Sequence, residues 1–182
     1  MSAAGPWLKE PGARVAGSRP LDRSKVQAPG AVRLPDGSVR LFYTAVGPAK
    51  PFPACQGYIL SALSADGLAF EPEPGIRLGP DPTIPNRSLR VIAPSVTRLD
   101  DGRWRMYVET RGPATEPTVI GSAVSTDLLD WTFEDGVRFR GFRGVGGCRY
   151  LRLPDGRGRL YAFADELLPG RDGTARRFHS AG

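Results

Sequence analysis

Residues 28–44 read APGAVRLPDGSVRLFYT, and the same pattern returns twice further along the chain. Residues 93–109 read APSVTRLDDGRWRMYVE, and residues 147–163 read GCRYLRLPDGRGRLYAF. Each stretch places a Leu-x-Asp-Gly sequence between two runs of alternating apolar residues. An Asp-Gly pair in this setting is a strong signal for a β-hairpin. Each copy therefore predicts two antiparallel strands joined by a type I′ turn, whose two central residues need a positive φ.

A second kind of stretch lies between these copies and is also repeated. Residues 58–78 read YILSALSADGLAFEPEPGIRL, and residues 119–139 read VIGSAVSTDLLDWTFEDGVRF. This pattern predicts a third strand, a turn at Asp66 or Asp127, and a fourth strand. The two kinds of stretch alternate, so one unit holds four short antiparallel strands. The spacing of Ser61 from Ser122 gives a period of about 61 residues.

Four strands per repeat at this length predict the blade of a β-propeller, an all-β fold. We expect one domain over residues 1–182 with about three blades, since sustained helical periodicity is absent from the sequence. The predicted repeat units are residues 16–78, 79–139 and 140–182, with residues 7–15 as an isolated fourth strand. Inner strands are expected near residues 29–34, 94–99 and 148–153, and their hairpin partners near 38–45, 103–110 and 157–164. Strands of the third kind are expected near 58–64 and 119–125, and strands of the fourth kind near 69–72 and 130–133.

The two ends of the chain match parts of a blade. Residues 7–15 repeat the Glu-Pro-Gly-x-Arg of residues 73–77, and residues 178–181 match the third strand that contains Ser122. Five blades would need roughly 300 residues, so we expect an incomplete five-bladed propeller. The predicted arrangement is an open arc in which residues 7–15 do not pair with residues 178–181. Its uncovered blade faces should be apolar and prone to self-association.

Composition bounds the other classes of function. The net charge is +6, but the arginines are scattered through the strand segments rather than gathered in one run, so nucleic acid is not the expected partner. No apolar run is long enough for a membrane span, and the first residues do not resemble a secretory signal. Cys55 and Cys148 form no metal or disulfide pattern and predict reduced thiols in a cytoplasmic protein. We find no nucleotide-binding motif and expect no cofactor and no metal.

The blade pattern resembles the five-bladed propeller glycoside hydrolases, a clan that includes arabinanases, β-xylosidases, invertases, levansucrases and related glycosyl phosphorylases. Residues 93–109 and 122–136 carry the resemblance, which extends over residues 7–181. A weaker similarity links SADGLAF, residues 64–70, to the Asp-box of sialidases. The resemblance implies a carbohydrate ligand and, in an active member, hydrolysis by paired carboxylates.

In that clan the catalytic acids lie near the start of each inner strand. The matching places here hold Gln27-Ala28-Pro29, Ile92-Ala93-Pro94 and Gly147-Cys148-Arg149, none of them acidic. We therefore expect little or no glycosidase activity from this chain alone. Glu109, Asp165 and Glu166 are weak catalytic candidates that could rim the funnel or be solvated loop acids. Gln27, Arg90 and Arg149 are the expected substrate-binding residues.

The remaining polar residues of interest have simpler interpretations. Asp22 and Asp81 are predicted turn residues, His179 has no triad partners, and Cys148 is expected to be a buried thiol. Three hypotheses remain open: a carbohydrate-active propeller with an incomplete site, a non-catalytic sugar-binding or interaction module, and a degenerate fragment without function. The sugar and its linkage are not indicated by the sequence.

Overall fold

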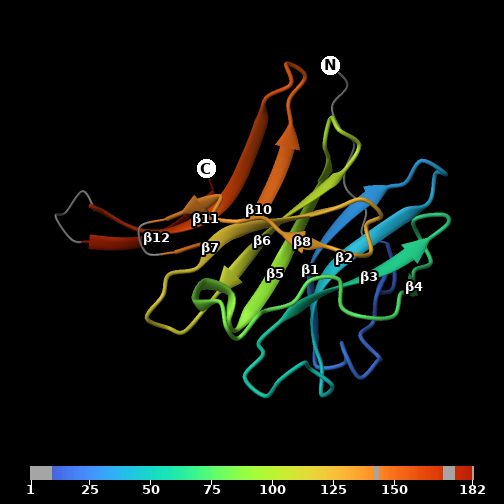
Figure 1. The fold of residues 1–182 in the computed structure, drawn as a ribbon, viewed down its shortest axis with the longest axis horizontal. Coiled ribbons are helices and arrows are strands. Elements are labelled where there is room, and N and C mark those ends of the chain that lie inside the picture. Colours follow the sequence, from blue (N-terminus) through green and yellow to red (C-terminus); the bar gives the residue numbers. More distant parts are fainter. Residues whose placement is uncertain (1–9, 142–143, 170–174, 182) are drawn as a thin grey trace.

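The structure, a computed structural model, describes residues 10–141, 144–169 and 175–181. Within these ranges the chain folds into three antiparallel sheets (Figure 1). The first sheet has the order β1 (Lys25–Arg33), β2 (Val39–Val46), β3 (Tyr58–Ser64) and β4 (Glu71–Pro72). The second has β5 (Arg90–Arg98), β6 (Trp104–Arg111), β7 (Val119–Ser125) and β8 (Thr132–Phe133), with β9 (Phe139–Arg140) also paired to β7. The third has β10 (Val145–Arg152), β11 (Gly158–Pro169) and β12 (Ala175–Ala181).

The all-β prediction is confirmed, and the strands follow the predicted repeat. The only helical segment among the described residues is the short 3-10 turn η1 (Pro85–Arg87). No helix there has the length and hydropathy needed to cross a bilayer. β3 and β7 have the predicted bounds, whereas β1, β5 and β10 begin at Lys25, Arg90 and Val145, earlier than expected. They begin earlier because pairing resumes on the far side of a β-bulge in each inner strand.

The predicted type I′ turns are wrong. Gly37, Gly102 and Gly156 have φ values of 91°, 86° and 83°, but the aspartates before them do not have a positive φ. In the first hairpin the Leu34 N–H donates to the Ser38 carbonyl at 2.8 Å, and the Gly37 N–H donates to the Leu34 carbonyl at 3.0 Å. The loop therefore contains three residues, a type I turn that ends in a left-handed glycine. One extra loop residue removes the need for a positive φ at the aspartate.

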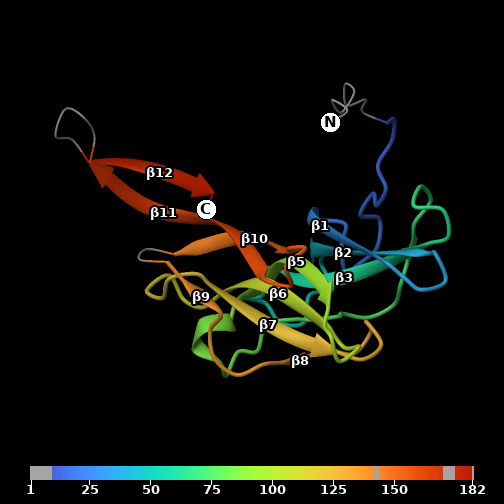
Figure 2. The same cartoon turned by 90° about the horizontal axis from the view of Figure 1, so that it is seen from above.

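The three sheets fan out from their inner strands, β1, β5 and β10 (Figure 2). β1 approaches β5 so closely that a Cβ atom on Gly30 would lie 2.4 Å from the Pro94 carbonyl oxygen. Arg149 of β10 reaches across to β1, where its Nη2 donates to the Pro29 carbonyl at 3.2 Å. The inner strands therefore surround a common axis, as propeller blades do. We call the face of each sheet that meets the next sheet along the chain its trailing face, and the opposite face its leading face.

Apolar cores fill the spaces between the sheets. The core between the first and second sheets includes Phe42, Val91 and Met106, all fully buried. A smaller core between the second and third sheets includes Ile120, Val145 and Cys148. A third core covers the leading face of the first sheet, where the partly buried residues 15, 21 and 26 pack on buried residues such as Tyr58.

A repeated polar network joins the strands within the first two sheets. In the first sheet Ser61 Oγ donates to Glu73 Oε2 at 2.7 Å, while Arg40 Nη2 donates to Glu73 Oε1 at 2.9 Å and Arg77 Nε donates to Ser61 Oγ at 2.7 Å. The second sheet repeats the network with Ser122, Glu134, Arg105 and Arg138. The network therefore pairs two strand arginines, Arg40 and Arg105, with carboxylates of their own sheets.

The two ends of the described chain lie apart in both views (Figures 1 and 2). Residues 10–15 form no strand, and β12 is paired with β11; residues 7–9 lie outside the described residues. Gly12 nevertheless has a φ of 81°, close to the 82° of Gly75, so the Glu-Pro-Gly-x-Arg turn is repeated. β12 is a third strand, but its pairing does not repeat that of β7. Ser180 pairs with Ala164, whereas Ser122 pairs with Tyr107, whose equivalent on β11 is Tyr161.

Candidate functional site

The starts of the three inner strands share one backbone feature. Each strand has a β-bulge, which lies between Gln27 and Gly30 in β1, between Ile92 and Ser95 in β5, and between Gly146 and Arg149 in β10. At the same place in each bulge the residue is left-handed, with φ values of 49° at Ala28, 56° at Ala93 and 58° at Gly147. Bulges of this kind turn a side chain away from the pleat and occur beside active sites. We call the place where the three bulges lie the mouth.

The second and third bulges are each held by a side chain from the preceding sheet. Thr44 Oγ1 of the first sheet accepts a hydrogen bond of 2.8 Å from the Ala93 N–H of the second. Glu109 Oε2 of the second sheet accepts one of 3.1 Å from the Gly147 N–H of the third. Thr44 and Glu109 have the same place in their sheets, because they pair with Gln27 and Ile92. This contact fixes the mouth by joining successive sheets.

Glu109 is therefore not the solvated loop acid that was one of its two interpretations. It is 8% exposed and lies within β6. Its Oε1 pairs with Arg90 Nη2, which comes from the start of β5. The structure thus brings together two predicted site residues, the buried Glu109 and the half-buried Arg90, as an ion pair beside the mouth. Their arrangement suits positioning of the β10 bulge.

Three other residues of the bulge regions, Gln27, Cys148 and Arg149, differ in solvent exposure. Gln27 and Arg149 are exposed. Arg149 Nη1 donates to the Cys148 carbonyl at 2.8 Å, so this guanidinium lies between β10 and β1 with part of its donors free for solvent or ligand. Cys148 is fully buried, as expected, and burial raises the pKa of its thiol to about 12. That thiol is not a nucleophile at neutral pH.

The remaining acidic candidates lie elsewhere. Asp165 and Glu166 are inside β11, where their backbones pair with His179 and Phe178, rather than after the strand as predicted. The side chains of these four residues lie outside the described part of the structure. Asp81 is a turn residue as expected; Oδ1 accepts hydrogen bonds from the Thr83 hydroxyl and N–H, and these lower the pKa of the carboxyl.

Asp22 begins the turn before β1 but is more than a turn residue. It is 1% exposed, and it accepts hydrogen bonds from the Arg19 N–H at 2.7 Å and from the Tyr43 hydroxyl at 3.1 Å. Burial is the main cause that raises the pKa of Tyr43 to about 12. Sequence reasoning missed this cluster because its members are separated along the chain and match no motif. The cluster anchors residues 19–22 on the leading face of the first sheet.

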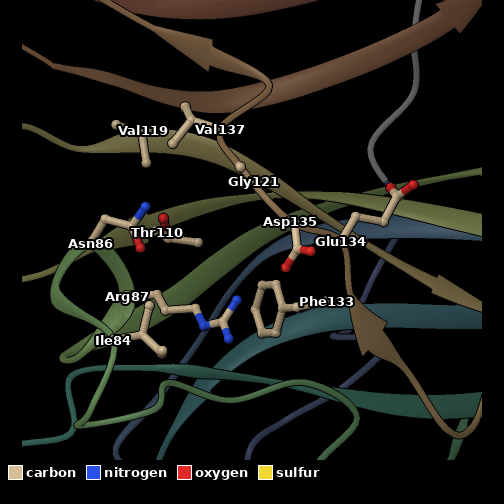
Figure 3. A pocket seen from close by; sticks show the side chains of 11 residues that line it. Ile84, Asn86, Arg87, Thr110, Val119, Gly121, Phe133, Glu134, Asp135 and Val137 are labelled. Atoms are coloured by element: carbon tan, nitrogen blue, oxygen red, sulfur yellow. The ribbon is translucent and has the colours of Figure 1, made fainter.

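A small pocket lies beside η1 and the outer strands of the second sheet (Figure 3). The Arg87 guanidinium lies 4.0 Å above the centre of the Phe133 ring, with Asp135 and Asn86 among the other polar residues of the lining. The pocket has a volume of about 170 Å³. Neither the spacing nor the composition of residues 84–87 marks this pocket in the sequence. Among the described residues, no group of three His, Cys, Asp or Glu side chains is placed to hold a metal ion.

Comparison with known proteins shows the fold. No family model and no curated protein sequence matches the chain. Solved structures do match. A family 117 glycoside hydrolase of Zobellia galactanivorans aligns with a TM-score of 0.65 and 16% identity over 82% of this chain and 50% of its own. A glycosyl hydrolase of Bacteroides ovatus aligns with a TM-score of 0.58 and 18% identity, over 85% of this chain and 51% of its own. An endo-1,4-beta-xylanase of Bacteroides thetaiotaomicron aligns with a TM-score of 0.61 and 12% identity, over 86% of this chain and 60% of its own.

The chain spans about half the length of the solved structures that it matches first. At these identities the likeness concerns the backbone, and it agrees with the propeller resemblance seen in the blade motifs. The chain has the fold of propeller-type glycoside hydrolases.

Proposed function

We propose that this chain binds carbohydrate at the mouth formed by the starts of β1, β5 and β10, and that it has little or no glycosidase activity by itself. The fold supports the first part, since its structural neighbours are described as glycoside hydrolases. The observation that carries the second part is the nature of the bulge residues. Ala28, Ala93 and Gly147 occupy the left-handed position of the three bulges, and the residues that follow them, Pro29, Pro94 and Cys148, carry no carboxyl group either.

Glycoside hydrolysis needs two carboxyl groups on either side of the scissile bond. The three bulge residues supply none. Glu109 lies beside them, with one oxygen paired to Arg90 and the other bound to the Gly147 N–H. A glutamate in this position holds the mouth in shape, whereas a general acid must carry a proton toward the leaving group. We assign Glu109 and Arg90 as positioning residues.

Sugar hydroxyls would be recognised by the exposed polar groups of the mouth. The amide of Gln27 can donate and accept hydrogen bonds, and the free donors of Arg149 can bind hydroxyl or carboxylate oxygens.

Both free cysteines are buried and unpaired with each other. This fits a reducing compartment, and we place the chain in the cytoplasm.

Isothermal titration with a panel of oligosaccharides tests the binding. We expect Arg149→Ala and Gln27→Ala to weaken the affinity, and Arg33→Ala, an exposed arginine at the far end of β1, to leave it unchanged. Aryl furanosides and pyranosides test the catalysis, and no turnover is expected. Turnover that Glu109→Gln abolishes would contradict the positioning role, and an absence of binding to every sugar would contradict the proposal itself.

A protein-interaction module is the second candidate. It is favoured by one specific observation, the exposed apolar face of the third sheet, where Leu151 and Phe163 are 52% and 54% exposed.

A further inference from the structure

Three aromatic residues have the same place on the trailing faces of the three sheets. Each of them pairs with the first residue after the bulge of its sheet. The pairs are Phe42 with Gly30, Tyr107 with Ser95, and Tyr161 with Arg149. Phe42 is fully buried and meets Trp131 of the second sheet edge to face, with ring centres 5.8 Å apart. Tyr107 stacks on Tyr150 of the third sheet at 5.1 Å. Each of these two rings is covered by the sheet that follows.

The third ring has no such cover among the described residues. Tyr161 is 38% exposed, and Leu151 and Phe163 beside it are more exposed still. Phe163 has the place of Thr44 and Glu109, the two residues that contact the next sheet. The trailing face of the third sheet, defined here by Leu151, Tyr161 and Phe163, therefore offers the surface that its two predecessors bury.

The leading face of the first sheet offers the complementary surface. In the second sheet Val91 and Met106 receive the ring of Phe42 in a closed core. Their equivalents by strand register in the first sheet are Val26 and Leu41, which are only partly buried. These two residues line an apolar groove of about 210 Å³ together with Arg14, Val15, Gln27, Pro29 and Tyr43.

Residues 10–15 do not block this groove. They form the same Glu-Pro-Gly-x-Arg turn as residues 73–77, so Val15 corresponds to Leu78. Leu78 lies in the core between the first two sheets, together with Phe42. The cover that Val15 gives to the first sheet is therefore compatible with a preceding sheet, and the groove is the space that such a sheet would fill.

We propose that copies of this chain associate head to tail, with Tyr161 and Phe163 of one copy inserted into the groove over Val26 and Leu41 of the next. The occupant is a second copy because the chain already contains two junctions of this kind, and its two uncovered faces are the two halves of a third. Ala31 of the second copy would lie under Tyr161, as Tyr150 lies under Tyr107. Such a contact is heterologous and generates a closed ring or an open chain.

Sedimentation velocity of the whole 182-residue chain over a range of concentrations tests the proposal. We expect the mass to rise with concentration for the unmodified protein. Tyr161→Glu combined with Phe163→Glu should weaken association by at least about tenfold, and Ala31→Glu should do so from the opposite face. Tyr161→Ser with Phe163→Ser, which adds no charge, should act in the same direction. Phe139→Glu is the matched control, since Phe139 is 46% exposed and belongs to β9 of the second sheet, and it should change nothing.

Mixing distinguishes head-to-tail contact from other arrangements. The Tyr161→Glu, Phe163→Glu variant keeps an intact leading face, and the Ala31→Glu variant keeps an intact trailing face. Their mixture should form a one-to-one dimer although each variant alone is monomeric. A mixture that stays monomeric while the unmodified protein associates would overturn the proposal. So would an unmodified protein that is monomeric at every concentration, or association that neither variant weakens. Binding of sugar is not measured in any arm, so the outcome is independent of the proposed function.

Discussion

The junction between the first and second sheets and the junction between the second and third are built on the same backbone but with different chemistry. At the first, a threonine hydroxyl accepts the hydrogen bond from the bulge, and the core beside it is large and apolar. At the second, the acceptor is the carboxylate of Glu109, Arg90 neutralises it, and the core is small. Lys25, the residue of β1 that corresponds to Arg90, is exposed.

The packing of successive inner strands therefore sets the geometry of the bulge, whereas the side chain that accepts its hydrogen bond can vary. A neutral acceptor needs no further support. A buried carboxylate must be paired, because an unpaired buried charge is costly. The change from Thr44 to Glu109 therefore requires a cation at the start of β5, and Arg90 supplies it.

The largest expected difference in stability is among the equivalent aromatic residues of the three sheets. Phe42→Ala should lower the free energy of unfolding by about 3–5 kcal/mol, since it removes a fully buried ring. Tyr107→Ala should cost about 1–2 kcal/mol, because Tyr107 is only partly buried. Tyr161→Ala should stay within about 0.5 kcal/mol, as at an exposed site. Urea unfolding at low protein concentration measures all three, and equal losses would contradict the assignment of buried and uncovered junctions.

Much of this architecture could be predicted from sequence, for a local reason. The Asp-Gly turns and the alternating residues around them are contained in single hairpins, so the sequence predicts β2 and β6 to within one residue of their observed bounds. The bulges could not be predicted, since Ala28 and Ala93 look like ordinary strand residues and their left-handed φ values depend on packing against a neighbouring sheet. The burial of Glu109 was missed for the same reason, because Arg90 and Gly147 come from other strands.

The charged junction should be the more sensitive of the two to loss of its acceptor. Glu109→Ala leaves Arg90 without its anion and the Gly147 N–H without an acceptor, at a cost of about 2–3 kcal/mol. Glu109→Gln keeps an acceptor and should lose less. Unfolding in urea measures the difference. If alanine and glutamine cost the same, the ion pair with Arg90 does not stabilise the junction.

The neutral junction should lose less stability when its hydrogen-bond acceptor is removed. Thr44→Val keeps the volume of the side chain but leaves the Ala93 N–H without an acceptor, at a cost of about 1–2 kcal/mol. Thr44→Ser retains the hydroxyl and serves as the control. Hydrogen exchange at the Ala93 amide gives a local measurement, because Thr44→Val should speed exchange there more than Thr44→Ser does. Unchanged exchange in both variants would show that the hydrogen bond is not formed in solution.

The smallest effect concerns the left-handed alanines, and it has the opposite sign. Left-handed backbone costs an L-residue about 1–2 kcal/mol, while glycine adds about 0.5–1 kcal/mol of chain entropy to the unfolded state. Ala28→Gly should therefore stabilise the protein by about 0.5 kcal/mol, because Ala28 is only partly buried. Ala93→Gly should be close to neutral, since Ala93 is 3% exposed and its methyl group contributes about 0.8 kcal/mol of burial. Thermal unfolding of the two variants side by side measures this, and a loss of stability in Ala28→Gly would mean that the first bulge is not left-handed in solution.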